Sequence, residues 1–411
     1  MDRRLTVIAG AAATIGLCSM AAWLMKSRRG RKGMKAIGVT RMCKFLKEEE
    51  GCSDDFVRRQ KDIYYTEALQ SVADFVGAKT ENLVFVSNTT TGVNCVLKSM
   101  KFKDGDMVLV SDLNYAAIAK TAFDVCDNSE KDLKYIIADI KFPIHGKDEV
   151  IQKYTDILEA NPSIRVAIID HITSATAVMM PIKELIQVCH DRGVKVVIDG
   201  AHAPGQVQLN LEELGADYYI GNLHKWLFTP RGSALLYVHP KHNKTVKPLV
   251  TSHNYQQSLQ EQFYMQGTCD DSPYLCAPAA IEFYQEIGGF DEINNYCTQL
   301  ISWAVEMLSK AWNTEQLQIP TEMRAPFMGM VALPENIINM SEVQYTRDFL
   351  NKKIVEIFDK YHIVCAYTIV QGRLWCRISA NVYNAKSDYY QVRDAVLDMI
   401  QQSATKMSDI Q

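Results

Sequence analysis

The chain has 411 residues, 47% of them hydrophobic and 22% charged, so it has enough apolar side chains to build a large core. Its formal net charge of -4 excludes a general electrostatic attraction to nucleic acid or to anionic lipid. The 11 cysteines are scattered, without a Cys-x-x-Cys pair or a Cys/His spacing that suits zinc. This pattern predicts free thiols in a reducing compartment and no metal site.

The N-terminal segment differs in composition from the rest of the chain. It carries no charge from Val7 to Met25, and basic residues stand on both sides of it. As a helix it would be about 28 Å long, close to the hydrocarbon thickness of a bilayer. We predict a transmembrane helix with the body of the protein in the cytosol, because the heavier basic cluster follows the segment. The alternatives are a mitochondrial presequence, a cleaved signal peptide, and a mitochondrial or cytoplasmic protein without an anchor.

Beyond this segment, residues 35–74 have a charged, helical pattern that predicts helices packed on the main domain. Short apolar runs then alternate with helical patterns. The runs are LVFVSN from Leu83, MVLVSD from Met107, KYIIAD from Lys134, RVAIID from Arg165, VKVVID from Val194, DYYI from Asp217 and SALLYV from Ser233. Continuous apolar strands between helices predict an α/β fold, with a mostly parallel sheet of about seven strands covered on both faces.

The pattern changes after about residue 278, where longer helices are interrupted by the short strands IVCAYTIV and LWCRISA. This change predicts a smaller α+β domain at the C-terminal end. We expect three parts: residues 1–34 as the anchor or targeting segment, residues 35–277 as the cofactor-binding large domain, and residues 278–411 as the small domain.

An acid and a lysine are the most informative pair of polar residues. Asp199 ends the strand VVID, and Lys225 lies on a later loop in the segment NLHKW. A buried carboxylate that pairs with a ring nitrogen and a lysine that forms an imine are the two groups that pyridoxal phosphate requires. Alone, Asp199 would be read as a turn or capping residue and Lys225 as a solvated charge. Together they predict pyridoxal 5'-phosphate as the cofactor, with both residues catalytic.

Further polar residues follow other predicted strands, at the edge where open parallel sheets bind ligands. Thr89 and Thr90 begin a helix and would offer N–H groups, hydroxyls and a helix dipole to the phosphate, although simple N-capping is the alternative. For the ring, we expect His202 at the phenolic oxygen and Tyr115 stacked on the face, with core packing as the alternative for each. Asn222 and His224 would complete the contacts to the phosphate of the cofactor.

Two residues are candidates for binding a small amino-acid substrate. His171 follows Asp170 at the end of the strand AIID, and this pair would orient substrate or cofactor. Arg377, near the start of a strand in the small domain, has the geometry for a bidentate clamp on an α-carboxylate. A structural ion pair is the alternative for Arg377.

Six segments occur in an order that resembles a known family. They are NTTTGVN, DHITSAT, DGAHAPGQ, ADYYIGNLHKWLFTPRGSALLYV, GTCDDSPYLCAPAAIEF and RISANVYN. Together they are similar to the class V aminotransferases of fold type I, in the branch of isopenicillin N epimerase-like proteins, L-cysteine desulfhydrases and ergothioneine-pathway C–S lyases. The resemblance implies that Lys225 carries the Schiff base and that Asp199 pairs with the pyridinium. It also implies a homodimer in which Thr268 reaches the phosphate bound by the partner subunit.

The chain departs from the family pattern at three places. The segment SRRGRKGMKAIG stands where the family has an Asn-His-Gly-Ser-type sequence that enters the active site. Cys269 follows the Gly-Thr pair where the family commonly has an arginine. Cys365 lies near the position of the sulfur-accepting cysteine of desulfurases, but within an apolar run that predicts a packed residue.

From these observations we predict a C–S lyase or cysteine desulfhydrase that acts by β-elimination. The alternatives are an amino-acid epimerase or aminotransferase, and a membrane-anchored pseudoenzyme with an altered substrate loop. Fold-level similarity does not decide among these reactions.

Overall fold

The computed structural model describes residues 28–335 and 347–408. The transmembrane helix that we expected from Val7 to Met25 lies outside these residues, and this expectation is corrected. Within the described part of the chain, no helix is both long enough and apolar enough to cross a bilayer.

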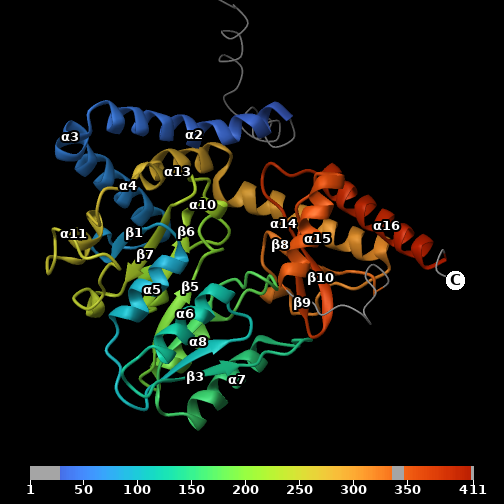
Figure 1. Cartoon of the computed structure of the whole chain (residues 1–411), viewed down its shortest axis with the longest axis horizontal. Coiled ribbons are helices and arrows are strands. Elements are labelled where there is room, and N and C mark those ends of the chain that lie inside the picture. Colours follow the sequence, from blue (N-terminus) through green and yellow to red (C-terminus); the bar gives the residue numbers. More distant parts are fainter. Residues whose placement is uncertain (1–27, 336–346, 409–411) are drawn as a thin grey trace, which may run out of the picture.

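A seven-stranded sheet forms the centre of the molecule and confirms the predicted α/β fold (Figure 1). Its order is β1-β7-β6-β5-β4-β2-β3, and every neighbouring pair is parallel except those that involve β7. The strands are β1 Leu83–Val86, β2 Met107–Ser111, β3 Lys134–Ala138, β4 Ile164–Asp170, β5 Lys195–Asp199, β6 Tyr218–Asn222 and β7 Ala234–Val238. Each lies within or beside an apolar run predicted from sequence.

Helices cover both faces of this sheet, as its fully buried central strands require. On one face, α5 (Thr89–Ser99) and α6 (Ala116–Asp127) contribute to one apolar cluster. On the other face, α4 (Lys61–Val76), α7 (Lys147–Ala160) and α8 (Ile182–His190) contribute to a second cluster. The parallel strands therefore all direct their carboxyl ends to one edge, between helices that exclude water from the sheet.

The N-terminal helices predicted from residues 35–74 are present. The helix α2 (Arg28–Gly51) packs on α12 (Ser272–Leu275) and α13 (Ala277–Glu286), and α13 packs on α4 (Figure 1). A short helix α3 (Ser53–Asp55) and a π-helical segment, Phe56–Gln60, connect α2 to α4. The remaining short helices of this part are α9 Leu211–Leu214, α10 Leu223–Trp226 and α11 Leu259–Tyr264.

A second sheet lies in the C-terminal part of the chain, beside α14 (Gly289–Trp312), which also packs on α16 (Lys386–Ser408) (Figure 1). It has three antiparallel strands in the order β8-β10-β9, and α15 (Arg347–Tyr361) precedes β9. The strands are β8 Met328–Ala332, β9 Ala366–Val370 and β10 Arg373–Ser379. We predicted β9 and β10 but missed β8, whose methionines and glycine carry little β preference. The boundaries of the three expected parts remain predictions.

Candidate active site

A cavity of about 490 Å³ lies where β4, β5 and β6 end and where α5 begins. This position follows from the topology, because the carboxyl ends of parallel strands open toward the same edge. Eight of the predicted site residues line it: Thr89, Thr90, Tyr115, Asp199, His202, Asn222, His224 and Lys225. The cavity therefore brings together residues that lie far apart in the sequence.

The start of α5 forms one end of the cavity. Asn88 caps this helix by accepting a hydrogen bond from the Thr91 backbone N–H at 2.9 Å. Asn222 crosses from the end of β6 and accepts the Thr89 backbone N–H at 3.0 Å. In contrast, the buried Thr89 Oγ1 has no hydrogen-bond partner among the described residues. A buried hydroxyl without a partner at a helix N-terminus is suited to donate a hydrogen bond to a bound anionic group.

Two carboxylic acids lie at the base of the cavity. Asp170 and Asp199 are the last residues of β4 and β5 and are direct neighbours in the strand register. Burial raises the pKa of both, and the neighbouring Asp199 raises the pKa of Asp170 further, to well above its usual range. The Ala201 backbone N–H donates to Asp199 Oδ1 at 2.9 Å, and Lys225 also favours its charged form. Asp170 therefore holds a proton more readily, and Asp199 ionises first.

Lys225 extends its amine into the cavity from the one-turn helix α10. Its Nζ lies 3.0 Å from Nε2 of His202, which is on the turn that follows β5. Burial lowers the pKa of Lys225 to about 8, although the charge of Asp199 acts in the opposite direction. Burial also lowers the pKa of His202 well below its usual range, with a further contribution from Lys225. The cavity thus holds an amine that is readily unprotonated beside a neutral imidazole.

Tyr115 and His224 complete the walls. Tyr115 is 49% exposed at the mouth of the cavity, and its backbone N–H is hydrogen-bonded to Asp170. His224 donates from Nδ1 to the Ser233 carbonyl at 2.7 Å, which leaves Nε2 for a ligand. Burial lowers the pKa of His224.

Arg377 lies beside the cavity rather than in its wall. It projects from β10, and its guanidinium Nη1 donates to the carbonyl oxygen of Ser174 and lies 3.3 Å from the Ser174 hydroxyl. Ser174 lines the cavity. The Arg377 Nε is buried and has no hydrogen-bond partner within the described residues. The Nη1 group is therefore satisfied by protein, whereas Nε retains a donor for an anion.

The structure does not bring His171 and Thr268 into this cavity. The ring of His171 points to the other side of the sheet, where Nδ1 lies 2.8 Å from the Tyr219 hydroxyl and the residue lines a separate cavity of about 920 Å³. Asp170 lines the cavity that contains Lys225, whereas His171 lines the other one. We therefore leave His171 out of the proposed site. Thr268 is exposed on the surface after Gly267, whose φ is +107°.

Three residues that sequence reasoning did not select also contribute. Asn114 donates from its side chain to Asp170 Oδ2, Ser174 binds Arg377, and the indole Nε1 of Trp226 lies 3.3 Å from His202 Nδ1. Each acts on another site residue through a tertiary contact. Only Trp226 had a sequence signal, which was its position directly after the lysine.

Comparison with known proteins decides the family. The model of the family "Aminotransferase class-V" matches residues 49–392. The chain belongs to the class V aminotransferase family. Its relatives include a probable chloroplastic L-cysteine desulfhydrase of Arabidopsis thaliana, 32% identical over 372 residues that cover 84% of this chain and 78% of that protein. Hercynylcysteine sulfoxide lyase of Schizosaccharomyces pombe is 25% identical over 382 residues, covering 90% and 92%.

Solved structures agree on the fold. The cystine C–S lyase C-DES, in complex with its product cysteine persulfide, superimposes with a TM-score of 0.72 at 17% sequence identity. The match covers 88% of this chain and 94% of that one. The predicted fold type I architecture is thereby confirmed.

Class V aminotransferases use pyridoxal 5'-phosphate, which is the cofactor of this chain. The cavity fits this group by its own chemistry. It has an unpaired hydroxyl at a helix N-terminus for a phosphate, a buried carboxylate for a ring nitrogen, and an amine of low pKa for the aldehyde. Of the predicted residues, Thr89, Asp199 and Lys225 would hold these three parts of the cofactor.

Proposed function

We propose that this protein is a pyridoxal phosphate-dependent C–S lyase that performs β-elimination on a cysteine-type amino acid. The observation that carries the proposal is the amine of Lys225. It is largely buried, lies 3.0 Å from a neutral imidazole, and has a pKa of about 8, so it is suited to accept a proton near neutral pH. The names of the relatives, a desulfhydrase and a sulfoxide lyase, support a substrate with sulfur at Cβ.

Each residue has one task in this proposal. The bound cofactor supplies an electron sink for negative charge at the substrate Cα. Asp199 stays ionised and keeps a positive charge on the ring nitrogen, while Asp170 holds Tyr115 through its backbone N–H. Arg377 binds the substrate carboxylate with the Nε donor that protein leaves free, and Ser174 fixes the orientation of its guanidinium.

The proposed reaction then follows from the position of the amine. Lys225 takes the proton from Cα, and the electron pair of the Cα–H bond forms the Cα–Cβ double bond as the Cβ–S bond breaks. The sulfur leaves as a thiolate or sulfide, and it takes up a proton. Hydrolysis of the unsaturated amine by water gives pyruvate and ammonia, so L-cysteine and water yield sulfide, pyruvate and ammonia.

The cysteines favour elimination over transfer of sulfur to the protein. No cysteine lines the cavity that contains Lys225 within the described residues. Cys365 is buried directly before β9, as predicted, where a thiol is a poor nucleophile. A sulfur-accepting cysteine would have to be exposed and near the leaving group.

The proposal includes a homodimer. Thr268 is exposed and lies outside the cavity of its own chain. A threonine on an exposed segment that begins at a glycine of positive φ is available to a neighbouring subunit. In the dimer, Thr268 of each chain would contact the phosphate held by the other. Light scattering should show a dimer, and Thr268→Ala should weaken cofactor binding without changing the folded state of the apoprotein.

The decisive experiment measures sulfide and pyruvate from L-cysteine with the purified holoenzyme. We expect the wild type to form sulfide and pyruvate in a one-to-one ratio. The control variant Lys195→Ala, which removes an exposed lysine at the start of β5, should do the same. We expect neither product from Lys225→Ala. Formation of D-cysteine would indicate an epimerase, and formation of alanine from pyruvate with a second amino acid would indicate an aminotransferase. A protein that takes up the cofactor but turns over no cysteine conjugate would refute the lyase proposal and favour a pseudoenzyme.

A further inference from the structure

A chain of two hydrogen bonds joins Trp226, His202 and Lys225. The Trp226 indole Nε1 donates to His202 Nδ1 at 3.3 Å, and His202 Nε2 lies 3.0 Å from Lys225 Nζ. Trp226 is 7% exposed and His202 is 6% exposed, so water does not compete for these contacts. The two nitrogens of one imidazole are therefore engaged by two protein groups on opposite sides.

The direction of these bonds follows from the donors. An indole N–H can only donate, so His202 Nδ1 must be the acceptor and carry no proton. A neutral imidazole has one proton, which is then on Nε2 and points at Lys225. The Lys225 nitrogen must accept this proton with its lone pair, which an ammonium group does not have. The contact with Trp226 thus favours an unprotonated lysine over a charged one.

We propose that Trp226 is a positioning residue that holds the proton of His202 on Nε2, so that His202 donates to Lys225 and favours the unprotonated form of the lysine amine. The inference rests on the proposed role of Lys225 as the base. It adds Trp226, a residue that acts through His202 and not by direct contact with the substrate. The same Nε2–H is the donor that His202 would offer to the cofactor.

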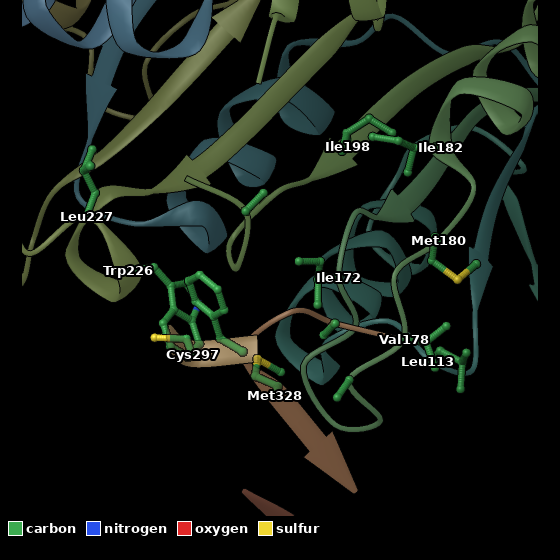
Figure 2. Packing of buried hydrophobic residues seen from close by; sticks show 14 of the residues in the cluster. Leu113, Ile172, Val178, Met180, Ile182, Ile198, Trp226, Leu227, Cys297 and Met328 are labelled. Carbon is green, nitrogen blue, oxygen red and sulfur yellow. The ribbon is translucent and has the colours of Figure 1, made fainter. Parts of the chain in front are cut away.

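The surroundings of Trp226 fix its indole in place. Its ring packs edge-on against Phe327, with centroids 5.6 Å apart, and it belongs to the same buried cluster as Cys297 and Met328 (Figure 2). Gln206 is fully buried and joins the turn that carries His202 to the segment that carries Phe327. Its side chain donates to the His202 carbonyl at 2.7 Å and accepts from the Phe327 backbone N–H at 2.9 Å. The indole and the imidazole are therefore held in one packed unit.

Close backbone packing sets the distance between this turn and α10. Gly205 has a φ of +86°, and a Cβ at this position would lie 2.5 Å from the Trp226 carbonyl oxygen. Only glycine permits this approach. The turn that carries His202 is thereby pressed against the backbone that carries Trp226 and Lys225.

Other charged groups act on the same lysine and must be separated from the effect of Trp226. Asp199 and Asp170 favour the ammonium form, whereas Arg377 opposes it. The change from tryptophan to phenylalanine alters none of these charges. It keeps an aromatic ring against Phe327 and removes the indole N–H.

The first test measures the tautomer of His202 in the wild-type apoprotein. Selective ¹⁵N labelling of the nine histidines, with assignment by the spectrum of His202→Gln, would show which ring nitrogen carries the proton. We expect a neutral ring with the proton on Nε2. At a pH above about 8, where most of the lysine is unprotonated, a proton on Nδ1 or on both nitrogens would overturn the proposal without any variant of Trp226.

The second test compares Trp226→Phe with Trp312→Phe. The control removes an indole N–H that donates to the Arg393 carbonyl at 3.3 Å, from a residue that is 4% exposed and lies on α14. Trace acetylation of the apoprotein, read by peptide mass spectrometry at several pH values, reports the unprotonated fraction of Lys225. In Trp226→Phe, His202 can place its proton on Nδ1 and accept a bond from an ammonium group at Nε2.

We expect the acetylation rate of Lys225 at pH 8 to fall about threefold or more in Trp226→Phe and to stay unchanged in Trp312→Phe. An unchanged rate in a folded Trp226→Phe would overturn the proposal. If this variant does not fold, the tautomer measurement on the wild type still decides. Both measurements use the apoprotein, so failure of the lyase proposal would appear separately as absent turnover.

Discussion

The amine of Lys225 should capture the cofactor far faster at neutral pH than an ordinary lysine would. Only the unprotonated amine attacks the aldehyde, so the rate of capture depends on its fraction. With a pKa of about 8 in place of 10.5, roughly a tenth of the amine is unprotonated at pH 7 instead of about one part in 3,000. The expected advantage is about 300-fold, and it originates in the burial of the amine.

The assay mixes apoprotein with pyridoxal phosphate and records the visible absorbance of the lysine-bound cofactor. The initial rate should rise about tenfold for each unit of pH below about 8 and then level off. Nα-acetyl-lysine in the same buffers corrects for ionisation of the cofactor itself. Lys225→Ala should show no capture at any pH.

The result that would refute this reasoning is a rate that continues to rise with pH and levels off only above about 10, as for a solvated lysine. In that case the buried environment does not lower the pKa of the amine. A rate that is already independent of pH well below 8 would refute it equally, because the amine would then be fully unprotonated at neutral pH.

Three further predictions concern single residues. Lys225→Met should raise the free energy of unfolding of the apoprotein by about 1–3 kcal/mol at pH 7, since folding no longer buries an amine that prefers to be charged. The wild-type penalty is full below the folded pKa of about 8 and is lost as the pH rises toward the unfolded value of 10.5, so urea titrations should show the gain shrinking over that interval. Thr89→Val should leave the apoprotein equally or more stable, because it removes a buried hydroxyl without a partner, yet weaken cofactor binding about tenfold in equilibrium dialysis; unchanged affinity would exclude Thr89 from the phosphate site. Arg377→Met should raise the KM for L-cysteine about 10- to 100-fold while the cofactor absorbance is retained, whereas Arg373→Met on the same strand should not; equal effects of the two would argue against a carboxylate clamp.

Much of the site was predictable because it depends on strand ends. The run VVID predicts a strand with an acid at its end, and parallel strands place such ends at one edge of the sheet. Asp199, Thr89 and Asn222 therefore converge for a reason that is visible in the sequence. The order of residues did not show that Asp170 and His171 would line different cavities, so a role of His171 in substrate binding stays a prediction.

The sequence by itself determined the alternation of apolar strands and helices, the family motifs and the identity of the reactive groups. These properties depend on neighbouring residues, on regular spacing, or on the order of short segments. Tertiary structure alone decided the protonation of these groups. Lys225 has an ordinary side chain, and its low pKa exists only because folding buries it beside His202. In the same way, only packing brings the indole of Trp226 to the far side of that imidazole.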